Sequence, residues 1–113
     1  MRILAIERDL PAPPAPNIKE LLRAEAACVW DLQKRGIIRD IWFTVEGHNA
    51  VIMLECRDAT EARQHLATLP LVQAGAIDFS IQELRSYDGY ERLFATEDVP
   101  SRSASGSTRK AKS

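Results

Sequence analysis

Alternating hydrophobic and polar positions predict four β-strands in this chain. Residues 2–8 are rich in Ile and Leu and short enough for a strand. Residues 38–46 alternate, residues 50–56 are nearly all apolar, and residues 76–84 alternate again. Gly, His and Asn at positions 47–49 are turn residues, so the second and third strands are expected to form an antiparallel hairpin.

A long helix is predicted between the first two strands. The first strand runs into the proline-rich segment 10–16, which lacks the N–H donors of a sheet and must be a connector. Nothing breaks a helix over residues 18–34. Asn17, with Glu20 three residues later, matches a capping box at its start, and Gly36 is suited to its end.

A second, shorter helix is predicted after the hairpin. Asp58 is a candidate N-cap, and Glu61 stands three residues later. The helix is expected to reach about Thr68, where the sequence Leu-Pro-Leu at 69–71 stops it.

The resulting order is β-α-β-β-α-β, which predicts an α+β domain with the ferredoxin-like arrangement. Two helices on one face of a four-stranded sheet leave the other face open, and a second copy packing sheet to sheet is the simplest cover. The apolar residues expected on this open face are Trp42, Ile52, Leu54 and Leu84. We expect one domain over residues 1–95, including a C-terminal arm at 85–95 with several aromatic residues, and a disordered basic tail at 96–113.

Composition restricts the classes of partner and compartment. The 113-residue chain has a net charge of −1, which gives no reason to expect nucleic acid or a membrane surface as a partner. No apolar run is long enough for a membrane span, and the N-terminus lacks a signal-peptide layout. Cys28 and Cys56 lie far apart in apolar stretches, as is typical of reduced thiols in a cytoplasmic protein.

Glu25 is the strongest candidate for chemistry. On a helical wheel it falls in the middle of the apolar stripe of the first helix, whose members are Ile18, Leu21, Leu22, Val29 and Leu32. Burial raises the pKa of a carboxyl group towards neutrality, which suits it to exchange protons near pH 7. The alternative is a structural carboxylate that pairs with Arg85 or with a group across a subunit interface.

The remaining candidates carry weaker signals. His48 is in the expected hairpin turn, and His65 is far from it without a matching cluster of acids, so no metal site is predicted. Trp42 could line a ligand pocket, although packing is the commoner role of such aromatics. The chain has no glycine-rich phosphate loop, nucleophile elbow or dinucleotide motif, so any enzyme is expected to work without a bound cofactor.

Several segments over residues 1–88 together resemble the muconolactone Δ-isomerases. The segments that carry the resemblance are Leu22-Arg23-Ala24-Glu25, Asp31-Leu32-Gln33-Lys34-Arg35-Gly36, Trp42, Leu69-Pro70-Leu71, Ile77-Asp78-Phe79 and Leu84-Arg85. The resemblance implies a dimeric α+β barrel assembled into a larger ring, such as a decamer. It also implies a cofactor-free shift of a double bond within an unsaturated lactone of aromatic catabolism.

The resemblance also assigns expectations to individual residues. Glu25 stands where the family has a glutamate suited to carry the proton, and Arg85 where it has an arginine that could hold a substrate carboxylate. Arg23 stands at a family lysine. Two positions depart from the family pattern, because Ala26 replaces a second acid and His48 replaces a tyrosine, although a histidine can itself exchange protons.

Three functions are compatible with these residues. The leading one is a cofactor-independent isomerase of a small unsaturated lactone or related acid, with Glu25 and His48 as catalytic groups and Arg85, Arg23 and Trp42 as substrate-binding groups. A cofactor-free monooxygenase with the same dimeric fold is an alternative, and it would require oxygen. A non-catalytic ligand-binding or assembly module is the third, and in it Glu25 would be held in an ion pair between subunits.

Overall fold

The computed structural model of the chain describes residues 1–95. Their elements are β1 (Arg2–Asp9), α1 (Ile18–Lys34), β2 (Ile38–Phe43), β3 (Ala50–Glu55), α2 (Ala59–Leu66), α3 (Pro70–Gln73), β4 (Ile77–Glu83) and the 3₁₀ helix η1 (Gly89–Leu93). The basic tail predicted at 96–113 lies outside the described residues.

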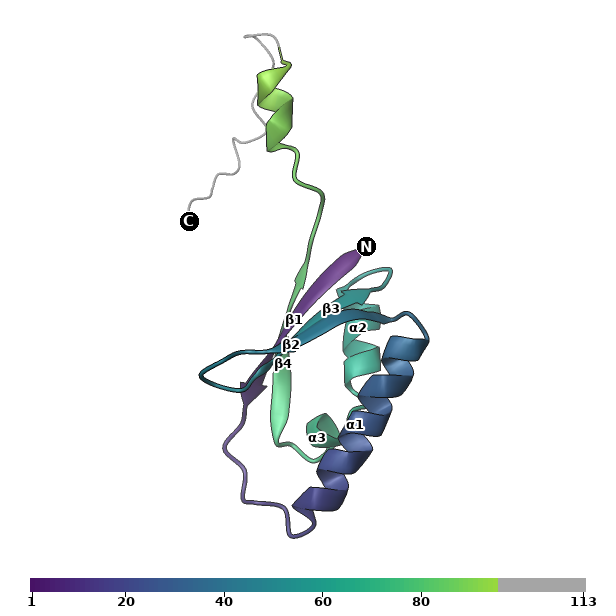
Figure 1. Cartoon of the computed structure of the whole chain (residues 1–113), viewed down its shortest axis with the longest axis vertical. Coiled ribbons are helices and arrows are strands. Elements are labelled where there is room, and N and C mark those ends of the chain that lie inside the picture. The colour runs from purple at the N-terminus through teal and green to yellow at the C-terminus, as the bar shows by residue number, and fades with distance from the viewer. Residues whose placement is uncertain (96–113) are drawn as a thin grey trace.

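The four strands form one antiparallel sheet in the order β2-β3-β1-β4. The three α-helices lie on one side of this sheet, and the other side carries no helix (Figure 1). The order of elements and the strand order confirm the α+β class and the ferredoxin-like β-α-β-β-α-β arrangement.

The hydrophobic core lies between the sheet and the helices. In β1 the alternate residues Ile3 and Ala5 are fully buried, because side chains of a strand point to opposite faces in turn. The buried residues of the core are Ile3, Ala5, Leu32, Ile38, Ala50, Ile52, Leu54, Cys56, Ala62, Leu66, Leu69, Ile77 and Phe79. Helix α1 contributes Leu32 and helix α2 contributes Ala62 and Leu66, while most of the other core residues belong to the strands.

The prediction for the open face of the sheet was partly wrong. Ile52 and Leu54 lie on the helix face and are buried, because Ile52 is the register partner of the buried Ala5. Trp42 does lie on the open face, where it pairs with Val51 and remains 52% exposed. The apolar residues of the open face are Leu4, Ile6, Trp42, Val51, Met53 and Leu84.

The ends of α1 are set by different means. The predicted capping box at its start is wrong, since the Asn17 side chain makes no cap hydrogen bond and its backbone is not in the extended conformation that a cap requires. At the other end, Gly36 has a φ of +79°, which glycine adopts without a steric penalty. The N–H groups of Gly36 and Ile37 donate to the carbonyls of Gln33 and Leu32 and close the helix as a Schellman motif.

The second helix begins as predicted and ends slightly earlier. The Asp58 Oδ1 accepts a hydrogen bond from the Glu61 N–H at 2.9 Å, which confirms the N-cap. Helix α2 ends at Leu66. The Leu-Pro-Leu sequence at 69–71 does more than stop it, because Pro70 occupies the first turn of the separate short helix α3.

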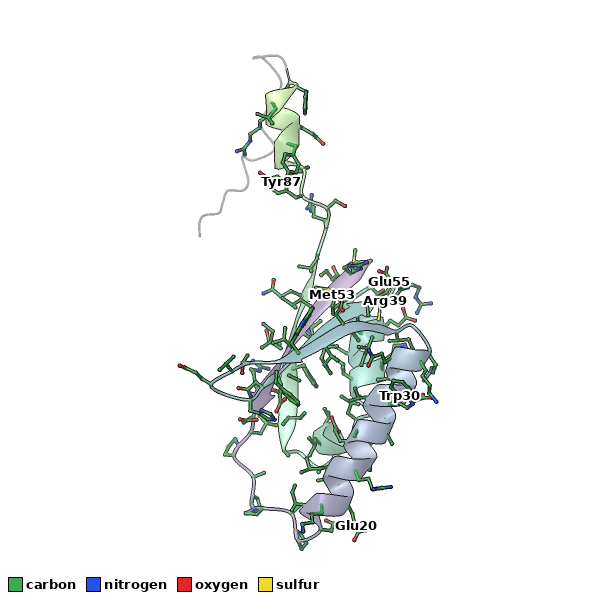
Figure 2. The ribbon with its side chains drawn as sticks, in the orientation of Figure 1. Glu20, Trp30, Arg39, Met53, Glu55 and Tyr87 are labelled. Carbon is green, nitrogen blue, oxygen red and sulfur yellow. The ribbon has the colours of Figure 1, made fainter. Side chains whose placement is uncertain are left out.

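The C-terminal arm of the domain extends away from the sheet (Figure 1). It contains η1, and the Tyr87 and Tyr90 rings meet edge to face with centroids 4.9 Å apart. Figure 2 shows Tyr87 far from the body of the domain. The large apolar side chains of the arm are strongly exposed, which leaves them available to another surface. None of the helices within residues 1–95 combines the length and apolar character required to cross a bilayer.

The two helix starts give a paired stability test. Asp58→Ala should lower the free energy of unfolding by about 1 kcal/mol, because the Glu61 N–H loses its acceptor. Asn17→Ala should change it by less than about 0.5 kcal/mol, because this side chain makes no cap bond. Urea denaturation of both variants checks the difference, and equal losses would contradict the assigned caps.

Candidate active site

Glu25 is located where α1 separates from the core. Towards the C-terminal end of the helix, Leu32 is buried and Val29 packs against the core. Towards the N-terminal end, Ile18 and Leu22 on the same stripe are 44% and 51% exposed. Glu25 lies between these halves and is half-buried, so the prediction that it faces inward is confirmed.

The Glu25 carboxyl group is held by the backbone of α3. Its Oε1 accepts a hydrogen bond from the Leu71 N–H at 2.9 Å. Leu71 is in the first turn of α3, where N–H groups have no acceptor within the helix. No salt bridge within residues 1–95 includes Glu25, so the alternative pairing with Arg85 does not occur inside one subunit.

The surroundings of Glu25 favour its protonated form. Burial raises the pKa of this carboxyl group, and the Leu71 N–H acts in the opposite direction because it stabilises the ionised form. The negative charge of Glu7 raises the pKa further. Glu25 therefore binds its proton more tightly than an exposed glutamate does.

Glu7 is a second carboxyl group on the helix-facing side of the sheet, and its charge acts on Glu25. The sequence patterns did not identify it. It follows the buried Ile3 and Ala5 at the next alternate position of β1, so it faces the helices. Its Oε1 accepts a hydrogen bond from the Ala50 N–H at 2.8 Å. Burial is the main cause that raises its pKa. The alternation of β1 could have identified Glu7, because it places this acid on the core-facing side of the strand.

His48 lies in the hairpin turn. Among residues 1–95, His48 is the one residue other than glycine that has a positive φ, +53°. Its backbone N–H donates a hydrogen bond to the Thr44 carbonyl at 3.1 Å. Its exposed ring stacks on Phe43 with centroids 4.0 Å apart. Because its charge lowers the pKa of Glu7, His48 is close enough to act on that carboxyl group. Glu25 and Glu7 thus face the interior of the domain from α1 and β1, and His48 in the exposed hairpin turn acts on Glu7 through its charge.

The three predicted substrate-binding residues lie elsewhere. Trp42 is on the open face of the sheet, and Arg23 is exposed, two residues from Glu25 and so on another side of α1. Arg85 follows β4 at the level of Met1, six residues along β1 from Glu7, which corresponds to roughly 20 Å. There it lines a hollow of about 520 Å³ with Met53, Glu55 and Leu84 among others.

The possible ligands for a metal or cofactor are few. Within the described part of the chain, no three His, Cys, Asp or Glu side chains are grouped as a metal site would require. Cys28 and Cys56 are both free, and the Cys28 Sγ lies 3.8 Å from the Thr68 carbonyl oxygen. Carboxyl and imidazole groups such as those of Glu25, Glu7 and His48 are by their own chemistry able to transfer protons.

Comparison with known families now identifies the chain's relatives. The model of the muconolactone delta-isomerase family matches residues 5–89. This chain belongs to that family. The match includes residues 5–9 of β1, together with α1, the hairpin and β4, and therefore Glu7, Glu25 and His48.

Two solved structures have the fold of this muconolactone delta-isomerase family member. A crystal structure of muconolactone isomerase aligns with a TM-score of 0.67 and 19% identity, covering 78% of this chain and 92% of that protein. The 5-chloro-2-hydroxyhydroquinone dehydrochlorinase of Burkholderia phenoliruptrix, in complex with 2,5-dihydroxybenzoquinone, aligns with a TM-score of 0.57 and 14% identity, covering 79% and 98%. None of the curated protein sequences compared with the chain matches it.

The raised pKa of Glu25 predicts a pH-dependent effect of Glu25→Gln. The folded protein binds this proton more tightly than the unfolded chain, so stability falls as pH rises from the ordinary pKa of a glutamate through the raised one. Glutamine keeps the acceptor for Leu71 but cannot ionise. The stability of the variant relative to the wild type should therefore increase as the pH rises from the ordinary pKa of a glutamate through the raised pKa of Glu25.

Urea denaturation at a series of pH values measures this trend. Glu20→Gln is the matched control, because it removes an exposed carboxyl group from the same helix (Figure 2). A difference between wild type and Glu25→Gln that does not change with pH would contradict the assigned surroundings of Glu25.

Proposed function

We propose that this protein is a cofactor-independent isomerase. It shifts a double bond within a small unsaturated lactone or a related carboxylic acid of aromatic catabolism, and Glu25 carries the proton. The observation that carries the proposal is the half-buried Glu25 carboxyl group with its raised pKa, in a chain of the muconolactone delta-isomerase family.

The chemistry of a double-bond shift matches what Glu25 offers. Ionised Glu25 takes a proton from the carbon next to the lactone carbonyl, and the electron pair of the broken C–H bond spreads into the carbonyl group. A proton then bonds to the far carbon of this conjugated system, and the double bond has moved. Because the same group must accept and release a proton near neutral pH, a pKa raised by burial increases its efficiency.

The two solved relatives support a reaction of this kind. One is by name an isomerase, and the other removes HCl from a chlorinated hydroxyhydroquinone. An isomerisation and a loss of HCl both depend on proton transfer at a small ring. Ala26 and His48 depart from the family pattern, so we expect a substrate related to muconolactone and distinct from it.

Arg23, Arg85 and Trp42 have no role in this proposal. Trp42 and Arg85 lie on or beside the open face, and Glu25 lies on the helix face. The substrate carboxylate would instead meet His48, which is exposed in the hairpin turn and whose charge acts on Glu7. A purely structural role for Glu25, as the acceptor for Leu71, is the competing explanation.

Glu25→Gln separates catalysis from structure. The amide oxygen still accepts the Leu71 hydrogen bond, so the fold should persist, while the proton carrier is lost. We expect kcat on an unsaturated lactone to fall by at least about 100-fold, the scale of general acid–base catalysis, with a smaller change in KM. Proton NMR of a panel of carboxylated lactones identifies the substrate and measures the rate.

The control and the alternatives are tested in the same assay. Glu20→Gln should keep the wild-type rate, because this carboxyl group is exposed at the far end of α1 (Figure 2). Turnover that stops when oxygen is excluded would favour the monooxygenase. An active preparation that keeps its full rate after Glu25→Gln would show that Glu25 serves only the fold.

We also propose that two copies pack through their open sheet faces and form the dimeric α+β barrel, from which a larger ring is built. The support is the uncovered apolar face, because soluble domains rarely leave such a surface in water. Ile6 in the centre of β1 is 39% exposed and Trp42 is 52% exposed. The exposed aromatics of the arm, Tyr87, Tyr90 and Phe94, would cover part of a neighbouring copy.

Ile6→Asp tests this assembly. An unpaired carboxylate in the middle of the interface should raise the dimer dissociation constant by at least about 100-fold. Val45→Asp is the matched control, because Val45 is equally apolar and 99% exposed but belongs to the hairpin turn. Sedimentation velocity measures both variants, and a monomeric wild type would contradict the proposal.

A further inference from the structure

A hollow of about 520 Å³ lies at one end of the open sheet face, where the C-terminal arm leaves the sheet. Three neighbouring chain segments form it, because Arg2 of β1 pairs with Glu55 of β3, and the Leu84 N–H after β4 donates to the Arg2 carbonyl at 2.9 Å. Arg85 and Ser86, the first residues of the arm, complete the wall. Figure 2 shows Glu55 at this end of the sheet. The volume is within the range of about 300–1,000 Å³ that is typical of ligand pockets.

The apolar part of this hollow is made largely of methionine. Both methionines of the chain, Met1 and Met53, line it together with Leu84. A methionine side chain is flexible and polarisable, so it adapts its shape to a ligand and makes favourable contacts with aromatic rings. The hollow therefore offers an adaptable apolar wall to a small ring.

The charged side chains of the hollow do not balance. Two arginines and one glutamate line it. The glutamate, Glu55, is already engaged, because its Oε1 accepts a hydrogen bond from the Arg2 Nε at 3.1 Å and its Oε2 accepts one from the Met1 amine. Arg85 is exposed and belongs to none of the salt bridges among residues 1–95. The hollow therefore has a positive charge that its own acid does not neutralise.

A cation beside an apolar wall defines the chemistry of the ligand. The planar guanidinium group of an arginine binds a carboxylate through two parallel hydrogen bonds. An apolar ring attached to that carboxylate would cover the methionine and leucine side chains and remove them from water. Phosphate or sulfate would use the arginine and leave the apolar wall bare, and an uncharged ring would leave the guanidinium without an anion. A small ring that carries a carboxylate meets both requirements.

We propose that this hollow is a binding site for a small carboxylic acid with an apolar ring, in which Arg85 holds the carboxylate and Met53 and Leu84 contact the ring. The site is separate from Glu25, because Met53 is on the open face, whereas Glu25 accepts the Leu71 N–H on the helix face. The proposal goes beyond the isomerase function and does not require it. Arg85 has a ligand of its own at this site and does not act on a substrate at Glu25.

The hollow is continuous with the open face, since Met53 belongs to both. A second copy packed on that face would form a roof over the hollow and bury the ring of the ligand further. Ligand binding and assembly would then stabilise each other, because a ligand favours the state that binds it more tightly. Binding is therefore measured on the full chain in its own state of association.

The two methionines report on the hollow directly. The chain labelled with [methyl-¹³C]methionine gives one NMR signal for each, and benzoate is the probe. We expect both signals to shift saturably, because both side chains line the hollow. Benzamide has the ring without the charge and acetate the charge without the ring, so each should bind at least about 10-fold more weakly. Absence of a saturable shift overturns the proposal and leaves side chains of a second copy as the occupant. Equal affinity for acetate overturns it as well, because the site would then be a plain anion contact.

Arg85→Gln tests the assigned carboxylate contact. The dissociation constant of benzoate should rise by at least about 10-fold, because a charge-assisted hydrogen bond is lost, and Arg85→Lys should cause a smaller rise, because it keeps the charge. Arg63→Gln is the matched control, since it removes an exposed arginine from α2. Glu25→Gln should also bind benzoate as the wild type does, because Glu25 does not line the hollow. Unchanged binding in Arg85→Gln, or loss of binding in Glu25→Gln, overturns the inference whether or not the protein isomerises a lactone.

Discussion

The alternation of side chains along an antiparallel strand is the constraint on which this structure depends. In β1 the odd positions face the helices and the even positions face away, and the hydrogen-bond register extends this division to β3 and β4. The hydrophobic core, the open apolar face and the placement of Glu7 all follow from it. Because Ile3 and Ala5 are buried, the next odd residue must also point towards α1, although it is an acid.

The candidate site exists because the core does not extend along the whole of α1. The C-terminal half of the helix is packed and its N-terminal half is exposed, so Glu25 is half-buried at the boundary. A deeper position would have required a full partner for the charge, and a shallower one would have left an ordinary surface glutamate. The short helix α3 completes the site, because its first turn offers an N–H to a carboxyl group from another element.

Much of the fold could be predicted from periodicity, since long alternating and helical patterns fix elements locally. The bounds of α1 and the cap at Asp58 agree with the sequence patterns. The prediction failed where the position of a side chain depends on strand register or on contacts between elements that are distant in sequence. Only the register shows that Ile52 faces the helices. Only the packed structure shows that Glu25 accepts a hydrogen bond from Leu71 and that Arg85 lies beside the hollow at the other end of the sheet. Glu25 was identifiable because it interrupts an apolar stripe. Glu7 interrupts one as well, but a strand of eight residues gives a shorter and weaker pattern.

The proline-rich connector between β1 and α1 has an effect that no contact in the folded domain reveals. Prolines at positions 11, 13, 14 and 16 fix φ and reduce the number of conformations open to the unfolded chain. The connector is tied to the sheet by the Leu10 N–H, which donates to the Ala76 carbonyl at 2.9 Å. A stiff connector holds α1 at a set height over β1 before any substrate arrives. Glu25 on α1 is thereby preorganised over the sheet, and under the proposed function the free energy of binding a substrate need not be spent on positioning it.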